Sequence, residues 1–93
     1  MVNLIILDGK IAISACYGSY VKFIMRFDKG IIPCRMHISK DVNWNPAQVF
    51  ATGKLVRIIG HLKSAKNSKM FIECDACEFD LDYEERYYVA NED

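Results

Sequence analysis

Basic side chains and flat rings alternate with apolar residues in several short stretches of this 93-residue sequence. Residues two apart point to the same side of an extended chain, so Tyr20, Lys22 and Arg26 would share one face of a strand. Lys and Arg neutralise phosphates, and aromatic, imidazole and guanidinium groups stack on nucleobases. This pattern is typical of a surface that binds single-stranded nucleic acid. The candidate binding residues are Tyr20, Lys22, Arg26, Arg35, His37, Arg57, Lys63, Lys66 and Lys69.

Charge is distributed unevenly along the chain, although twelve basic and twelve acidic residues give a formal net charge of zero. Residues 1–70 hold eleven Lys and Arg against three Asp, a net charge of +8, and residues 71–93 hold nine acids against Arg86, a net charge of −8. No acid occurs among the basic residues of the adjacent predicted strands, which favours a binding surface over the alternative of ordinary solvated strand faces. A basic body indicates a polyanion ligand, and the acidic end either competes for the same surface or serves as a solubilising tail.

Residue patterns that support catalysis are not found in the sequence. It has no Gly-rich phosphate loop, no nucleophile elbow and no pair of metal ligands at helical spacing. The two histidines, His37 and His61, fall in separate stretches, and most acids lie in the C-terminal end. We therefore expect a binding protein without a cofactor rather than an enzyme.

The four cysteines are Cys16, Cys34, Cys74 and Cys77. Nothing indicates secretion, so disulfides are not expected. Alternation puts Cys34 and Cys74 on apolar strand faces, where a free thiol packs as a small hydrophobe, and puts Cys77 on the opposite face. The single C-x-x-C pair would need a second pair of ligands to hold zinc, and the sequence leaves open whether Cys16 and Cys34 supply it.

The elements that must position these residues are five strands and one helix. Asn45 suits a helix N-cap, Pro46 the first helical position and Gly53 the residue after the helix. Trp44 and Val49 have the spacing of a hydrophobic staple, which favours a packing role for Trp44 over a role as a base-stacking platform.

The alternation of apolar and polar residues predicts strands at 4–15, 20–27, 31–38, 54–63 and 69–79.

This order of elements predicts an all-β fold with one short helix. Five strands with a helix between the third and the fourth is the arrangement of the five-stranded OB-fold β-barrel. We expect residues 1–79 to form this OB-fold domain and residues 80–93 to form an acidic C-terminal extension. The extension either adds one more strand or a short helix before it frays, or acts as an autoinhibitory tail in the basic groove.

Several segments resemble the bacterial single-stranded DNA-binding protein family, among them residues 23–27 at its second strand, 49–51 at its helix end and 71–79 at its fifth strand. Residues 3–11 (NLIILDGKI) are similar to its opening strand, residues 31–34 (IIPC) to the start of its third strand, and residues 53–62 (GKLVRIIGHL) to its fourth strand. The match covers roughly residues 2–79. The family of the small dimeric primosomal replication protein N is a related possibility.

The resemblance implies sequence-nonspecific binding of single-stranded DNA in replication, repair or recombination, and the same chemistry fits RNA. It also implies a homodimer or homotetramer that assembles through the first strand, together with a replication-protein partner. The sequence departs from the family in a short first connection, in a loop at 64–68 without an aromatic residue, and in His37 where the family often has Trp or Phe. The alternative is an OB-fold protein-interaction module of a replication or primosome assembly.

No apolar run is long enough for a signal peptide or a membrane span, because Asp8 and Gly9 interrupt the N-terminal run at once. This pattern predicts a cytoplasmic protein without membrane contact.

Overall fold

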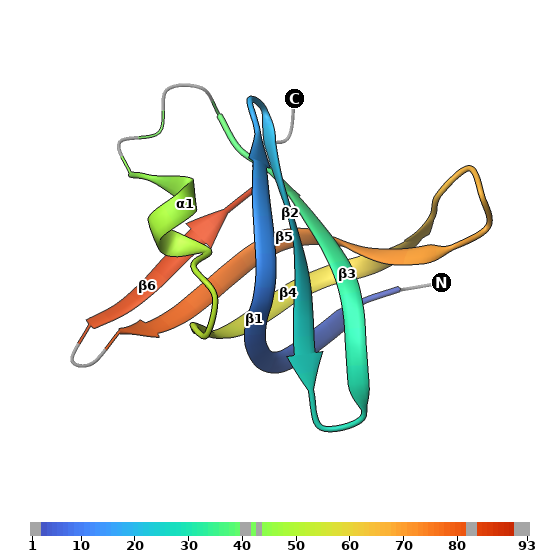
Figure 1. The fold of residues 1–93 in the computed structure, drawn as a ribbon, viewed down its shortest axis with the longest axis horizontal. Coiled ribbons are helices and arrows are strands. Elements are labelled where there is room, and N and C mark those ends of the chain that lie inside the picture. The colour runs from blue at the N-terminus through green and yellow to red at the C-terminus, as the bar shows by residue number, and fades with distance from the viewer. Residues whose placement is uncertain (1–2, 40–41, 43, 82–83, 91–93) are drawn as a thin grey trace.

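Two antiparallel three-stranded meanders build the structure (Figure 1). The computed structural model describes residues 3–39, 42, 44–81 and 84–90. Helix α1 lies in the connection between the two meanders. The elements are β1 (Ile5–Tyr17), β2 (Tyr20–Phe27), β3 (Gly30–His37), α1 (Pro46–Val49), β4 (Leu55–Ser64), β5 (Met70–Leu81) and β6 (Glu84–Val89).

The meanders join along two seams, and the seams close a barrel. β1 pairs antiparallel with β4 as well as with β2, and β3 pairs parallel with β5 at Cys34–Ile72 and Arg35–Glu73. The ring therefore runs β1-β2-β3-β5-β4 and returns to β1. The predicted all-β class, with a five-stranded OB-like barrel and one short helix, is confirmed.

Two glycines allow strands to pass close to neighbouring backbone. β1 pairs with β4 over residues 5–10 and with β2 over residues 10–17, so the strand changes partner next to Gly9. A Cβ on Gly9 would clash with the carbonyl oxygen of Arg26, and a Cβ on Gly60 would clash with that of Glu73. Only glycine fits at these positions without a backbone shift.

The helix begins as predicted and ends early. The Asn45 side chain caps it by accepting a hydrogen bond from the Ala47 amide at 3.0 Å, and Pro46 follows at the first helical position. The helix stops at Val49 instead of continuing towards Gly53. Phe50 leaves the helix there and is fully buried, with its ring centroid 5.1 Å from that of Phe23 and 5.3 Å from that of Phe79.

Aromatic packing ties the last strand to the barrel. β6 pairs with the C-terminal half of β5, so the strand alternative for this segment is the one that forms. Tyr88 on β6 lies 4.5 Å from Trp44 and 5.9 Å from Phe79, measured between ring centroids. Trp44 is half-buried and thus packs, as the staple spacing predicted. Residues 84–90 are accordingly a structural extension of the barrel wall.

A bulge in β5 overturns the predicted side-chain faces of its second half. Ile59 pairs with Ala76 and Gly60 with Cys74, which leaves Asp75 as an extra residue in β5. Alternation resumes one residue later, so Cys77 is buried and does not lie on the outer face as predicted. Cys34 and Cys74 are buried as expected, and Cys16 is exposed.

Candidate nucleic-acid interface

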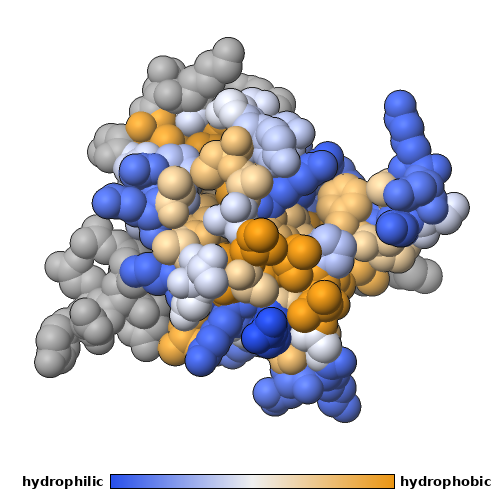
Figure 2. Space-filling view, in the orientation of Figure 1, coloured by the Kyte–Doolittle hydropathy of each residue, from blue (hydrophilic) through white to orange (hydrophobic). Residues whose placement is uncertain are grey.

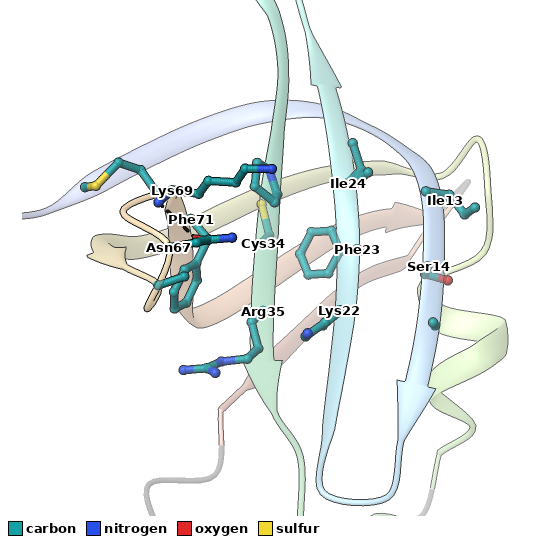
Figure 3. Close-up of a pocket in the computed structure, with 14 residues that line it drawn as sticks. Ile13, Ser14, Lys22, Phe23, Ile24, Cys34, Arg35, Asn67, Lys69 and Phe71 are labelled. Carbon is teal, nitrogen blue, oxygen red and sulfur yellow. Dashed lines mark hydrogen bonds between the residues drawn. The ribbon is translucent and has the colours of Figure 1, made fainter.

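An open groove crosses the outer face of β1, β2 and β3, and the loop between β4 and β5 forms its wall (Figure 3). Its volume is about 490 Å³. In Figure 1 the same loop projects away from the barrel. The lining residues are Ile13, Ser14, Ala15, Lys22, Phe23, Ile24, Pro33, Cys34, Arg35, Ala65, Asn67, Lys69, Met70 and Phe71.

Strand register arranges the outward side chains of the groove in rows. Ile24 pairs with Ile13 on one side and with Pro33 on the other, which gives an apolar row across three strands. The next row carries Lys22 opposite Arg35. Figure 2 shows apolar surface over the middle of this face with hydrophilic surface around it. The groove thus combines an apolar floor with cations along its side.

A third row extends the face with aromatic rings. Tyr17 and Tyr20 are stacked with 5.2 Å between their ring centroids, and His37 lies 5.9 Å from Tyr20. The ammonium nitrogen of Lys22 lies 5.7 Å from the Tyr17 ring and 5.9 Å from the Tyr20 ring. Tyr17 is half exposed, at 50%. Flat rings beside a cation can accept a nucleobase and the adjoining phosphate.

Glu73 on β5 is a buried acid at the centre of the basic residues. One of its oxygens accepts a hydrogen bond from Nη2 of Arg35 at 2.6 Å and the other accepts from Nε at 3.4 Å. Lys63 Nζ lies 3.7 Å and His37 Nε2 lies 3.8 Å from Oε1 of Glu73. The guanidinium carbon of Arg35 also lies 4.8 Å from the centroid of the Phe71 ring.

Burial and charge act in opposite directions on Glu73. Burial raises the pKa of its carboxyl, but the hydrogen bonds from Arg35 and the charges of Arg35, His37 and Lys63 outweigh it, so the net pKa lies below the ordinary value. The same hydrogen bonds raise the pKa of Arg35. The carboxylate and the guanidinium therefore remain charged together at neutral pH.

The basic stretches contain no acids in sequence, but the fold brings acids from other strands beside some of their cations. Closing the barrel brings Glu73 of β5 beside Arg35 of β3, although neither stretch contains both charges. Asp8 on β1 likewise pairs with Arg57 on β4, with Oδ1 2.7 Å from Nε. The pattern within one strand could not predict these ion pairs, because each acid lies on a neighbouring strand of the closed sheet.

The structure brings most of the predicted residues to one region. Lys22, Arg35 and Lys69 line the groove, Tyr20 and His37 adjoin it, Lys66 is exposed in the wall loop, and Lys63 lies against Glu73. Arg26 lies on the outer face of β2 opposite Ile31, and Arg57 lies on β4 beside Asp8, so neither lines the groove.

Two aromatic residues of this face were missed in the sequence. Tyr17 lies outside the strands predicted at 4–15 and 20–27, but β1 continues through it, and the alternation from Ala15 leads directly to it. Phe71 lies within the strand predicted at 69–79 and is not among the candidate binding residues. The register of β5 against Lys63 places it at the groove.

No protein-family model and no curated protein matches this sequence. The resemblance to bacterial single-stranded DNA-binding proteins therefore stays a prediction, and the fold and the groove carry the functional argument. Within residues 3–39, 42, 44–81 and 84–90, no helix is long and apolar enough to cross a membrane. In the same residues, no three His, Cys, Asp or Glu side chains are grouped so as to hold a metal ion.

Proposed function

We propose that this protein binds single-stranded nucleic acid without sequence specificity, in replication, repair or recombination of DNA. The observation that carries the proposal is the groove itself. Its apolar floor, its flanking cations and the row of stacked rings lie together on one face of an OB-like barrel. Sequence-nonspecific binding of single strands uses this combination, because every base has an aromatic face and every nucleotide has a phosphate.

The cations of the groove differ in how freely they can meet a phosphate. Arg35 and Lys63 are partly neutralised by Glu73. Lys22 and Lys69 form no ion pair with any described residue, and both are exposed. We therefore expect Lys22 and Lys69 to supply phosphate contacts.

The decisive measurement is the affinity for fluorescently labelled oligo-dT at 50 mM and 200 mM salt. Binding should weaken with salt with a logarithmic slope of about −0.7 for each phosphate contact to a single strand. Lys22→Ala and Lys69→Ala should each lower the affinity about threefold to tenfold at low salt. Lys29→Ala is the matched control, because Lys29 is exposed in the β2–β3 turn outside the groove. Absence of binding at 50 mM salt, or equal losses for Lys29→Ala and Lys22→Ala, would exclude the groove as the binding site.

A second candidate function is protein interaction, and an apolar outer surface on β1 and β4 favours it. Ile6 on β1, Leu55 on β4 and Leu4 just before β1 expose 54–60% of their surface, outside the groove. An exposed apolar surface of several large side chains is typical of an interface. It would serve a homodimer, a homotetramer or a replication partner. Sedimentation of the wild type and of Ile6→Lys distinguishes self-association, since only the variant should be monomeric if this surface joins copies.

A further inference from the structure

Arg35 occupies an unusual position for a cation in a binding groove. Its guanidinium edge is held by both carboxylate oxygens of Glu73, and its centre lies over the Phe71 ring. The side chain of Glu73 is 9% exposed, whereas that of Arg35 is 31% exposed. Arg35 is thus fixed on the β5 side and still open to the groove that it lines.

This arrangement changes what Arg35 can bind. Glu73 accepts hydrogen bonds from Nε and Nη2, so a phosphate that approached the remaining N–H donors of the guanidinium would also approach this carboxylate and be repelled by it. The planar face of a guanidinium carries no N–H donor and stacks well on an aromatic system. A nucleobase therefore gains more from Arg35 than a phosphate does.

We propose that Arg35 is a nucleobase-stacking platform and not a phosphate contact, and that Glu73 is the positioning residue that makes it one. Phe71 supports the platform from below, in the same groove as Lys69. This inference rests on the proposed binding of single strands. It assigns to one cation of the groove a role that its charge alone would not indicate.

Two variants test separately the flat surface of the Arg35 guanidinium and its positive charge. Arg35→Lys keeps the positive charge but loses the flat surface and the two-point contact with Glu73. Glu73→Gln keeps the size of the side chain but removes the charge that balances Arg35. Asp75→Asn is the matched control, because it removes one negative charge from the bulge of the same strand, where Asp75 contacts His61 and not Arg35.

Each variant is titrated with oligo-dT and with an oligonucleotide of equal length whose central residues are abasic, over a series of salt concentrations. For Arg35→Lys we expect the preference for oligo-dT over the abasic probe to fall threefold or more, with the salt slope unchanged. For Glu73→Gln we expect the same loss of preference and a salt slope steeper by about 0.7 for each phosphate newly contacted. Asp75→Asn should match the wild type in both readouts.

The opposite results overturn the proposal. If Arg35→Lys keeps the full preference for bases, Arg35 does not stack on them. If Arg35→Ala makes the salt slope shallower by one contact, Arg35 binds a phosphate in the wild type. A wild type that binds neither probe refutes the proposed function itself, whereas a wild type that binds oligo-dT with unaltered variants refutes only the role of Arg35 and Glu73. Thermal unfolding of each variant confirms that the affinities refer to folded protein.

Discussion

Arg35 and Glu73 are paired both through the backbone register of their strands and through their side chains. Their Cα atoms are paired in the parallel register between β3 and β5, and their side chains form an ion pair with 2.6 Å between Nη2 and Oε1. The seam that closes the barrel and the chemistry of the groove therefore depend on the same two residues.

Removal of Glu73 should destabilise the fold. Glu73→Ala leaves Arg35, Lys63 and His37 without their common carboxylate. Breaking a fully buried pair costs about 3–5 kcal/mol, but the Arg35 side chain is 31% exposed, so we expect about 1–2 kcal/mol. Urea denaturation measures this loss. An unchanged midpoint would show that the ion pair contributes nothing to the seam.

Stability should fall in acid partly through Glu73. Its pKa is lowered in the folded protein from an ordinary value of 4.5, because the hydrogen bonds from Arg35 and the charges of Arg35, His37 and Lys63 together outweigh burial, which raises it. As pH falls, Glu73 therefore becomes protonated in the unfolded chain before it does in the folded protein. Its contribution to stability is complete above the ordinary pKa and is lost as pH falls through the folded pKa. The difference in unfolding free energy between wild type and Glu73→Gln should shrink as pH falls below about 5 and then through the folded pKa. A difference that grows in that range would reverse the assigned sign.

Alanine at Gly9 or Gly60 should be strongly destabilising. Its Cβ would clash with the backbone carbonyl of Arg26 or of Glu73, and backbone cannot rotate away as a side chain can. We expect a loss of about 2–4 kcal/mol in each case. Gly18→Asn is the control, since Gly18 has open space around it and asparagine tolerates a positive φ. If all three variants lost equal unfolding free energy, glycine would be required at these positions for its conformational freedom and not because neighbouring backbone lies close.

Only one of the four thiols should react quickly in the folded protein. Cys16 is exposed, whereas Cys34, Cys74 and Cys77 are buried. Contact with the Cys74 thiol, together with burial, raises the pKa of Cys34. For Cys74, contact with Cys34 lowers the pKa, but contact with Cys77 and burial together raise it by more, so its net pKa is also raised. Titration with a disulfide reagent at pH 8 should detect one fast thiol before unfolding and four in urea. Three or more fast thiols in the native state would contradict this packing.

Local alternation was sufficient to predict the strands. β2 has the predicted bounds, and the other four strands of the ring differ by one or two residues at each end. The capping chemistry of Asn45 and Pro46 likewise predicted where the helix begins, since both act within one turn. These features depend on neighbours along the chain.

Features that depend on distant neighbours were not predictable in this way. The early end of the helix follows from the burial of Phe50 among rings from β2 and β5. The bulge at Asp75 inserts one extra residue into the alternation of inward and outward side chains along β5, so simple alternation assigned Cys77 to the wrong face. The pairing of Arg35 with Glu73 spans 38 positions and exists only after the barrel closes.

The two-seam architecture also has a consequence for how fast the protein folds. Each meander joins strands that follow one another in the chain, whereas the seams unite β1 with β4 and β3 with β5. Loop-closure entropy delays contacts between distant segments, so we expect the meanders to be structured before the rate-limiting barrier and the β3–β5 seam after it. In stopped-flow experiments, Glu73→Ala should then accelerate unfolding and leave the refolding rate nearly unchanged. A variant that instead slows refolding would place the seam in the folding nucleus.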